Sequence, residues 1–148
     1  MMEAAFWSLA LRASSHYKPS NWIIPKEKFM FRNLFGSPKS KPAVAAITPA
    51  ALKRRLDAGE QLYLLDVRSS EEYAYDGHIA GARLLPLPLL SLRIGDLPKD
   101  VPIVCVCLSG SRSSMAATQL ARQGFPTVLN LTGGMGAWKH AGLPVKQG

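Results

Sequence analysis

The fold of this chain is decided by one stretch, Ile103-Val104-Cys105-Val106-Cys107, and by the loop and helix that follow it. Five consecutive apolar residues of this kind indicate a buried strand of a parallel sheet. The chain then runs through a short loop, residues 108–112, into a helix predicted over Ser113–Gln123, which Gly124 ends. The residues expected on the buried face of that helix are Met115, Ala116 and Leu120.

The same alternation of strand and helix continues on both sides of this stretch. Further strands are predicted over residues 62–67, 82–85 and 127–131, and further helices over residues 50–57, 70–76, 89–94 and 135–141. Two of the helix starts carry capping signals. Thr48 precedes a proline, and Ser69 with Glu72 has the spacing of a capping box. Trp138 is the expected core anchor of the last helix.

This alternation predicts an α/β fold of three layers. We expect a central, mostly parallel sheet of about five strands with helices on both faces. Ligands of such sheets bind beyond the carboxyl ends of the strands. Cys107 and Asp66 each end a predicted strand, so chemistry is expected at that edge.

The first 45 residues differ from the rest of the chain and are interpreted as a separate N-terminal extension before a domain over residues 46–148. Prolines interrupt every helical pattern there, and residues 36–42 have the composition of a linker. The chain carries a net charge of +8, and its basic excess lies mainly in this part, where Glu27 opposes many Lys and Arg residues. We expect a solvated tail and no nucleic-acid partner, although docking to an anionic partner and a true start at Met30 are left open.

Length and cysteine content limit the class of protein. The chain has 148 residues and 47% hydrophobic residues, which is enough for one packed core. Its two cysteines lie two positions apart on a strand, too far apart to form a disulfide, so a reducing compartment is expected. No apolar run reaches the ~20 residues that span a bilayer. We expect a cytoplasmic monomer, and a short apolar run over residues 4–11 leaves export as an alternative.

Cys107 is the candidate nucleophile. It stands where a strand ends and a loop containing Gly110 leads into a helix, so backbone N–H groups and the helix N-terminus can converge on its sulfur. Such an environment lowers the pKa of a thiol and makes the thiolate available. The alternative is an ordinary buried cysteine beside a turn. Cys105, in mid-strand, is expected to be a packing residue.

The order of motifs resembles the rhodanese family. Its first signature is similar to Leu65-Asp66-Val67-Arg68, then Glu72-Tyr73, then Gly77-His78-Ile79-Ala80-Gly81-Ala82. Its active-site loop is similar to Cys107-Leu108-Ser109-Gly110-Ser111-Arg112-Ser113, and its closing motif to Gly133-Gly134-Met135-Gly136-Ala137-Trp138 with Gly142-Leu143-Pro144-Val145. Together they cover about residues 46–146. The resemblance implies a single-domain sulfurtransferase that takes a sulfane sulfur onto Cys107 as a persulfide and passes it on, without a metal or organic cofactor.

The resemblance also implies roles for the neighbours of Cys107. The residues expected to bind the substrate and cradle the persulfide are Leu108, Ser109, Gly110, Ser111, Arg112 and Ser113. Asp66 and Arg68 are expected to brace this loop, with a plain surface ion pair as the alternative. The implied partners are a small sulfur-containing anion or a protein persulfide as donor, and a thiol or cyanide as acceptor.

The loop departs from thiosulfate-specific members of the family, which often carry extra cations after the cysteine. Here those positions hold Leu108 and Ser109, which leaves room for a persulfide or polysulfide donor. Two other functions stay open. Cysteine-dependent phosphatases and arsenate reductases resemble this arrangement, but they have five residues between Cys and Arg, whereas Cys107 and Arg112 are separated by four. A non-catalytic rhodanese-like binding module is the other, and the presence of Cys107 speaks against it.

Overall fold

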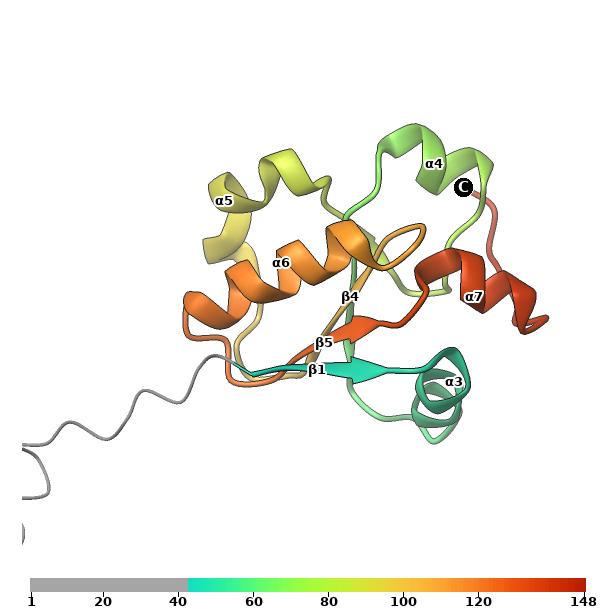
Figure 1. Ribbon diagram of the computed structural model, residues 1–148, viewed down its shortest axis with the longest axis horizontal. Coiled ribbons are helices and arrows are strands. Elements are labelled where there is room, and N and C mark those ends of the chain that lie inside the picture. Colours follow the sequence, from blue (N-terminus) through green and yellow to red (C-terminus); the bar gives the residue numbers. More distant parts are fainter. Residues whose placement is uncertain (1–42) are drawn as a thin grey trace, which may run out of the picture. The chain divides into compact units, whose positions relative to one another are not determined.

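The structure, a computed structural model, describes residues 43–148 and contains one five-stranded sheet (Figure 1). Its strands are β1 (Val44–Ile47), β2 (Tyr63–Asp66), β3 (Arg83–Leu84), β4 (Ile103–Val106) and β5 (Val128–Leu131). They lie in the order β1-β5-β4-β2-β3, and every neighbouring pair is parallel. The parallel sheet of about five strands predicted from the sequence is therefore confirmed.

Helices cover both faces of the sheet, as predicted. The α-helices are α3 (Pro49–Asp57), α4 (Ser70–Tyr75), α5 (Leu90–Arg93), α6 (Ser111–Arg122) and α7 (Gly134–His140), and two 3-10 helices are η2 (Leu87–Leu89) and η3 (Ile94–Asp96). Helices α5 and α6 lie on one side of the sheet, and α3 and α7 lie on the other (Figure 1). The predicted caps are present, because Thr48 accepts the N–H of Ala51 and the capping box of Ser69 with Glu72 opens α4.

Side-chain alternation along the strands divides the apolar residues into two cores. On β4, Ile103 and Cys105 point into the core beneath α6, whereas Val104 and Val106 point into the core beneath α3 and α7. All four residues of β4 are buried, as a strand with helices on both faces requires. Trp138 is 1% exposed in the second core, where the sequence placed it. Helices thus pack on both faces of the sheet, and Cys107 directly follows its fully buried strand β4.

Strand β1 was not predicted. It pairs with β5 at the edge of the sheet, with Val44 opposite Val128 and Ile47 opposite Leu131. The expected boundary between residues 45 and 46 falls inside this strand. The part of the predicted extension up to residue 42, including the linker and Met30, lies outside the described residues.

The predicted orientation of α6 was wrong at one position. Met115 was expected in the core, but it is 64% exposed. The buried residues of this helix are Ser113, Ala116, Ala117 and Leu120, which follow the i, i+3, i+4, i+7 spacing of one helical face. Met115 lies off that face. The helix also begins at Ser111 rather than Ser113, because Gly110 turns the chain with φ +99° directly before it.

No helix within residues 43–148 has the length and apolar character needed to cross a membrane.

Candidate active site around Cys107

Cys107 follows β4 directly, beside the end of β2, where Asp66 is the register partner of Val106. The Cys107 side chain is buried, with only 1% of the residue exposed. The backbone N–H of Gly110 donates to its Sγ at 3.0 Å, and the Ser113 hydroxyl lies 3.2 Å from the same atom. The sulfur therefore rests among hydrogen-bond donors at the N-terminus of α6.

These donors set the charge state of the thiol. Burial by itself raises the pKa of Cys107, but hydrogen bonds from the Ser113 hydroxyl and from the N–H groups of Ser113, Gly110 and Ser109 outweigh it. The net pKa lies below the ordinary value for cysteine. The positive end of the α6 dipole acts in the same direction. The thiolate form of Cys107 is therefore stabilised relative to that of an ordinary cysteine.

Asn130 completes this network, although the sequence analysis did not select it. Its Oδ1 accepts the Ser113 hydroxyl at 2.6 Å, and its Nδ2 donates to the Gly110 carbonyl at 3.3 Å. The Asn130 side chain therefore contacts both the Ser113 hydroxyl and the turn at Gly110, and each of these contacts the sulfur. A polar residue in the apolar run Val128–Leu131 was the available signal.

Helix α7 supports the loop from the other side. The N–H of Met135 donates to the Cys107 carbonyl at 2.8 Å, and the N–H of Gly136 donates to the Leu108 carbonyl at 2.9 Å. Gly134 has φ +56°, and a Cβ there would lie 2.3 Å from the Cys107 carbonyl oxygen. A glycine is required because backbone meets backbone at this point. The glycine-rich motif before Trp138 thus holds the loop around Cys107.

Arg112 does not present a free guanidinium to the site. Its Nη1 and Nη2 donate to the two carboxylate oxygens of Glu72, each at 2.7 Å. The Arg112 hydrogen bonds are the largest cause that lowers the pKa of Glu72 to about 2, so this pair stays charged at neutral pH. The sequence indicated Glu72 as a helix-capping residue and as part of the family motif, but not as the partner of Arg112. Nothing in its position along the chain shows that α4 and the loop meet.

Asp66 and Arg68 form a fully buried ion pair. Both side chains are 0% exposed, so the alternative of a surface ion pair is wrong. Arg68 donates to both carboxylate oxygens of Asp66 and also to the carbonyls of Glu72 and Gly77. These contacts fix the segment of α4 that carries Glu72. They brace the loop only indirectly, through the contact of Glu72 with Arg112.

The remaining predicted loop residues face outward. Leu108 is 44% exposed, and Ser109 and Ser111 are also exposed, with Ser109 contributing only its backbone N–H to the sulfur. Within residues 43–148 no group of three or more His, Cys, Asp or Glu side chains is placed to hold a metal ion.

Comparison with known proteins decides the family. The model of the rhodanese-like domain family matches residues 48–141, which is most of the chain. The chain belongs to the rhodanese-like domain family. It is 41% identical over 102 residues to a sulfurtransferase of Allochromatium vinosum, and this match covers 69% of the chain and 94% of that protein.

A second relative of this rhodanese domain is a thiosulfate sulfurtransferase of Shewanella oneidensis. It is 36% identical over 87 residues, which cover 59% of the chain and 85% of that protein. Among solved structures, a rhodanese-like domain protein of Staphylococcus aureus is similar with a TM-score of 0.62 and 32% identity, over 70% of the chain and 99% of that protein. Family membership and the names of these relatives support sulfur transfer as the general activity.

The second cysteine of the rhodanese domain has the opposite character. Burial raises the pKa of Cys105 to about 12, and its side chain is 0% exposed between the sheet and α6. Both cysteines are free and belong to the same core, as their spacing predicted. Cys105 is thus a packing residue that stays protonated.

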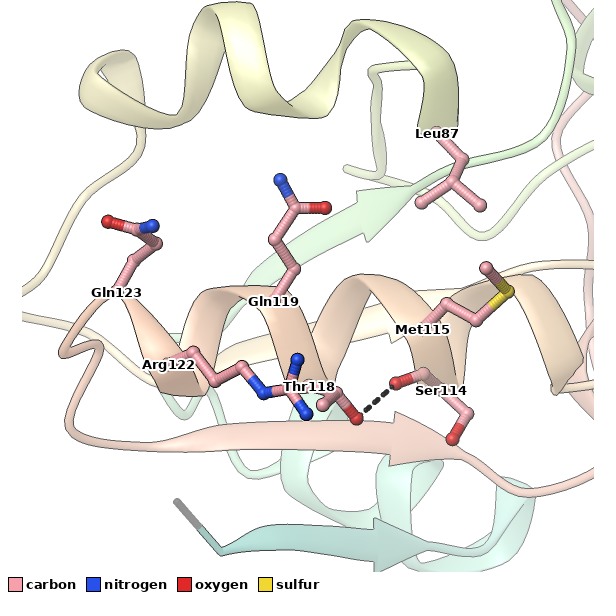
Figure 2. A pocket seen from close by; sticks show the side chains of 7 residues that line it. All are labelled: Leu87, Ser114, Met115, Thr118, Gln119, Arg122 and Gln123. Carbon is pink, nitrogen blue, oxygen red and sulfur yellow. Dashed lines mark hydrogen bonds between the residues drawn. The ribbon is translucent and has the colours of Figure 1, made fainter. Parts of the chain in front are cut away.

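A cavity of about 640 Å³ lies along the outer side of α6, but it is separate from the sulfur. Figure 2 shows Leu87 and Met115 near the end where α6 begins and Gln123 at the far end, with Thr118 bonded to the Ser114 carbonyl between them. Neither Cys107 nor any residue of the loop 108–112 lines this cavity. Met115 is exposed because it lines this surface cavity and does not lie on the buried face of α6.

Proposed function

We propose that the chain is a sulfurtransferase in which Cys107 carries the transferred sulfane sulfur as a persulfide. The observation that carries the proposal is the buried thiol with a lowered pKa, held by Gly110, Ser109 and Ser113. These donors hold one anionic sulfur without a cationic side chain in contact with it. The terminal sulfur of a persulfide is an anion of the same kind, one bond further from the protein.

In the first half-reaction the Cys107 thiolate attacks the outer sulfur of a donor. A bond forms between Sγ and that sulfur, the donor's own S–S bond breaks, and the electron pair leaves with the remainder of the donor. The leaving group is sulfite from thiosulfate, or a thiolate from a persulfide. The loop's N–H groups and the α6 N-terminus stabilise the charge that remains on the enzyme's outer sulfur.

In the second half-reaction an acceptor removes that sulfur. Cyanide or a thiolate attacks the outer sulfur, the enzyme's S–S bond breaks, and the electron pair returns to Cys107. The same donors that stabilise the starting thiolate receive it again. Neither half-reaction needs an external oxidant or a cofactor, because the transferred sulfane sulfur keeps its oxidation level while one nucleophile replaces another on it.

Phosphatase chemistry is a weaker candidate for this site. The loop has four residues between Cys107 and Arg112, and the Arg112 fork already binds Glu72. Neither feature suits a tetrahedral oxyanion. A non-catalytic binding module would not require the lowered pKa of Cys107. We also propose a reducing, cytoplasmic setting and a monomer, on the sequence arguments given above.

The kinetic order of the reaction tests this function. With thiosulfate or a small-molecule persulfide as donor and cyanide as acceptor, thiocyanate formation should give parallel lines in double-reciprocal plots, because a covalent intermediate separates the two substrates. An aryl phosphate should not be hydrolysed. Intersecting lines, or phosphate release that depends on Cys107, would contradict the proposal.

A further inference from the structure

Both terminal nitrogens of the Arg112 guanidinium bind the Glu72 carboxylate. The two hydrogen bonds of 2.7 Å join α6 to α4, forty positions apart in the chain. The pair is partly accessible, with side-chain exposures of 39% for Arg112 and 24% for Glu72. A bidentate, partly buried pair of this geometry keeps its partners together more firmly than a surface pair.

Glu72 is itself held in place from two directions. Its Oε2 accepts the backbone N–H of Ser69 at 3.1 Å, and its own N–H donates to the Ser69 hydroxyl at 3.2 Å. Arg68, anchored in the core by Asp66, donates to the Glu72 carbonyl at 3.4 Å. The carboxylate is therefore positioned by the fold, and it is not a mobile side chain that met Arg112 by chance.

The charge of the loop is balanced as a result. Leu108, Ser109 and Ser111 are neutral, and Arg112 is the one cation among residues 108–113. Its charge is offset by Glu72 at contact distance. An incoming dianion would meet a cation whose field is largely cancelled, and it would also approach the Glu72 carboxylate.

We infer that Glu72 is a specificity-determining residue that neutralises Arg112 and so favours sulfane-sulfur donors of low charge, such as persulfides, over the thiosulfate dianion. The inference rests on the proposed sulfur transfer and names the donor class for the same site. With a persulfide donor, the Cys107 thiolate takes the outer sulfur, the donor's S–S bond breaks, and the donor thiolate leaves with the electron pair. The proton of a neutral persulfide leaves with that thiol.

Two donors that differ by one charge test the inference. Thiosulfate is a dianion, and methanethiosulfonate is a monoanion with its sulfane sulfur on the same kind of sulfonyl group. In the variant Glu72→Gln, the second-order rate of sulfur loading should rise about tenfold for thiosulfate and distinctly less for methanethiosulfonate, because the restored positive charge attracts the dianion more. Glutamine also serves in a capping box, so the start of α4 is kept.

Glu71→Gln is the matched control. It removes the same charge from the neighbouring position of α4, but Glu71 is exposed and has no bond to Arg112 in the described residues. Its ratio of the two loading rates should equal that of the wild type. The rise in Glu72→Gln should also decrease with added salt, as expected for an electrostatic effect.

The outcomes separate this inference from the proposed function. If the wild type takes sulfur from neither donor nor from a persulfide, the proposed function fails and this inference fails with it. If the wild type is loaded normally and Glu72→Gln leaves the ratio unchanged, only this inference is overturned. If Glu72→Gln does not fold by circular dichroism, Glu72→Ala replaces it, since Ser69 still accepts the N–H at position 72. Loss of the fold in both variants would assign Glu72 to stability alone and would overturn the inference.

Discussion

The variant Cys107→Ser should form no thiocyanate from any sulfane-sulfur donor, while its circular dichroism and melting temperature stay close to those of the wild type. A serine hydroxyl is a poor nucleophile here and cannot carry a persulfide. The fold should survive because the smaller hydroxyl still accepts the Gly110 N–H and meets the Ser113 hydroxyl. The buried position therefore does not leave a polar group without partners.

Cys105→Ser is the control for this variant, two positions earlier on the same strand. It should keep most of the activity, because Cys105 is 0% exposed and its raised pKa keeps it protonated. It should cost about 1–3 kcal/mol of stability, since the new hydroxyl lies in the apolar core. A folded but inactive Cys105→Ser would contradict the separation of the two thiols, and so would residual transfer by Cys107→Ser.

The second large effect is expected at the buried ion pair. Asp66→Ala leaves the Arg68 guanidinium at 0% exposure with only the carbonyls of Glu72 and Gly77 as partners. Removing one member of a buried pair costs about 3–5 kcal/mol, a large part of the stability of a domain of this size. Urea unfolding followed by tryptophan fluorescence measures it, since Trp138 lies in the core.

Two further variants show that the effect comes from the unpaired charge. Asp96→Ala removes a carboxylate that pairs with Arg93 on the surface, and it should leave the urea midpoint unchanged. The double variant Asp66→Ala, Arg68→Met should be more stable than Asp66→Ala alone, because it removes the orphaned charge. If Asp66→Ala unfolds at the wild-type midpoint, the pair is not the structural anchor described above.

Local signals in the sequence were sufficient for most of the fold. The capping box of α4 and the apolar run of β4 each follow from interactions within a few residues, so their positions were predictable. Strand β1 was missed because Val44–Ile47 is short and gains its place only from pairing with β5. Met115 was placed in the core because it is apolar, whereas the helical spacing of the buried residues excludes it.

At the candidate site, too, local sequence patterns predicted some residues and missed those that come from distant segments. Cys107 and the loop after it could be selected because a single strand-loop-helix unit contains them. Glu72 and Asn130 come from α4 and β5 and reach the loop only after the sheet has assembled. The burial of Asp66 and Arg68 also depends on packing from several elements. Contacts between distant segments carry no local pattern, so they were found only in the structure.

The central claim is that Cys107 carries the transferred sulfur, and mass spectrometry tests it most directly. The wild-type protein is exposed to a sulfane-sulfur donor, the excess is removed, and free thiols and persulfides are alkylated before digestion. Trypsin releases both cysteines in one peptide, residues 100–112, so fragmentation of this peptide must assign the site. We expect one added sulfur atom on Cys107, lost again on addition of cyanide. A peptide that gains no sulfur, or gains it on Cys105, would show that Cys107 does not carry the transferred sulfur.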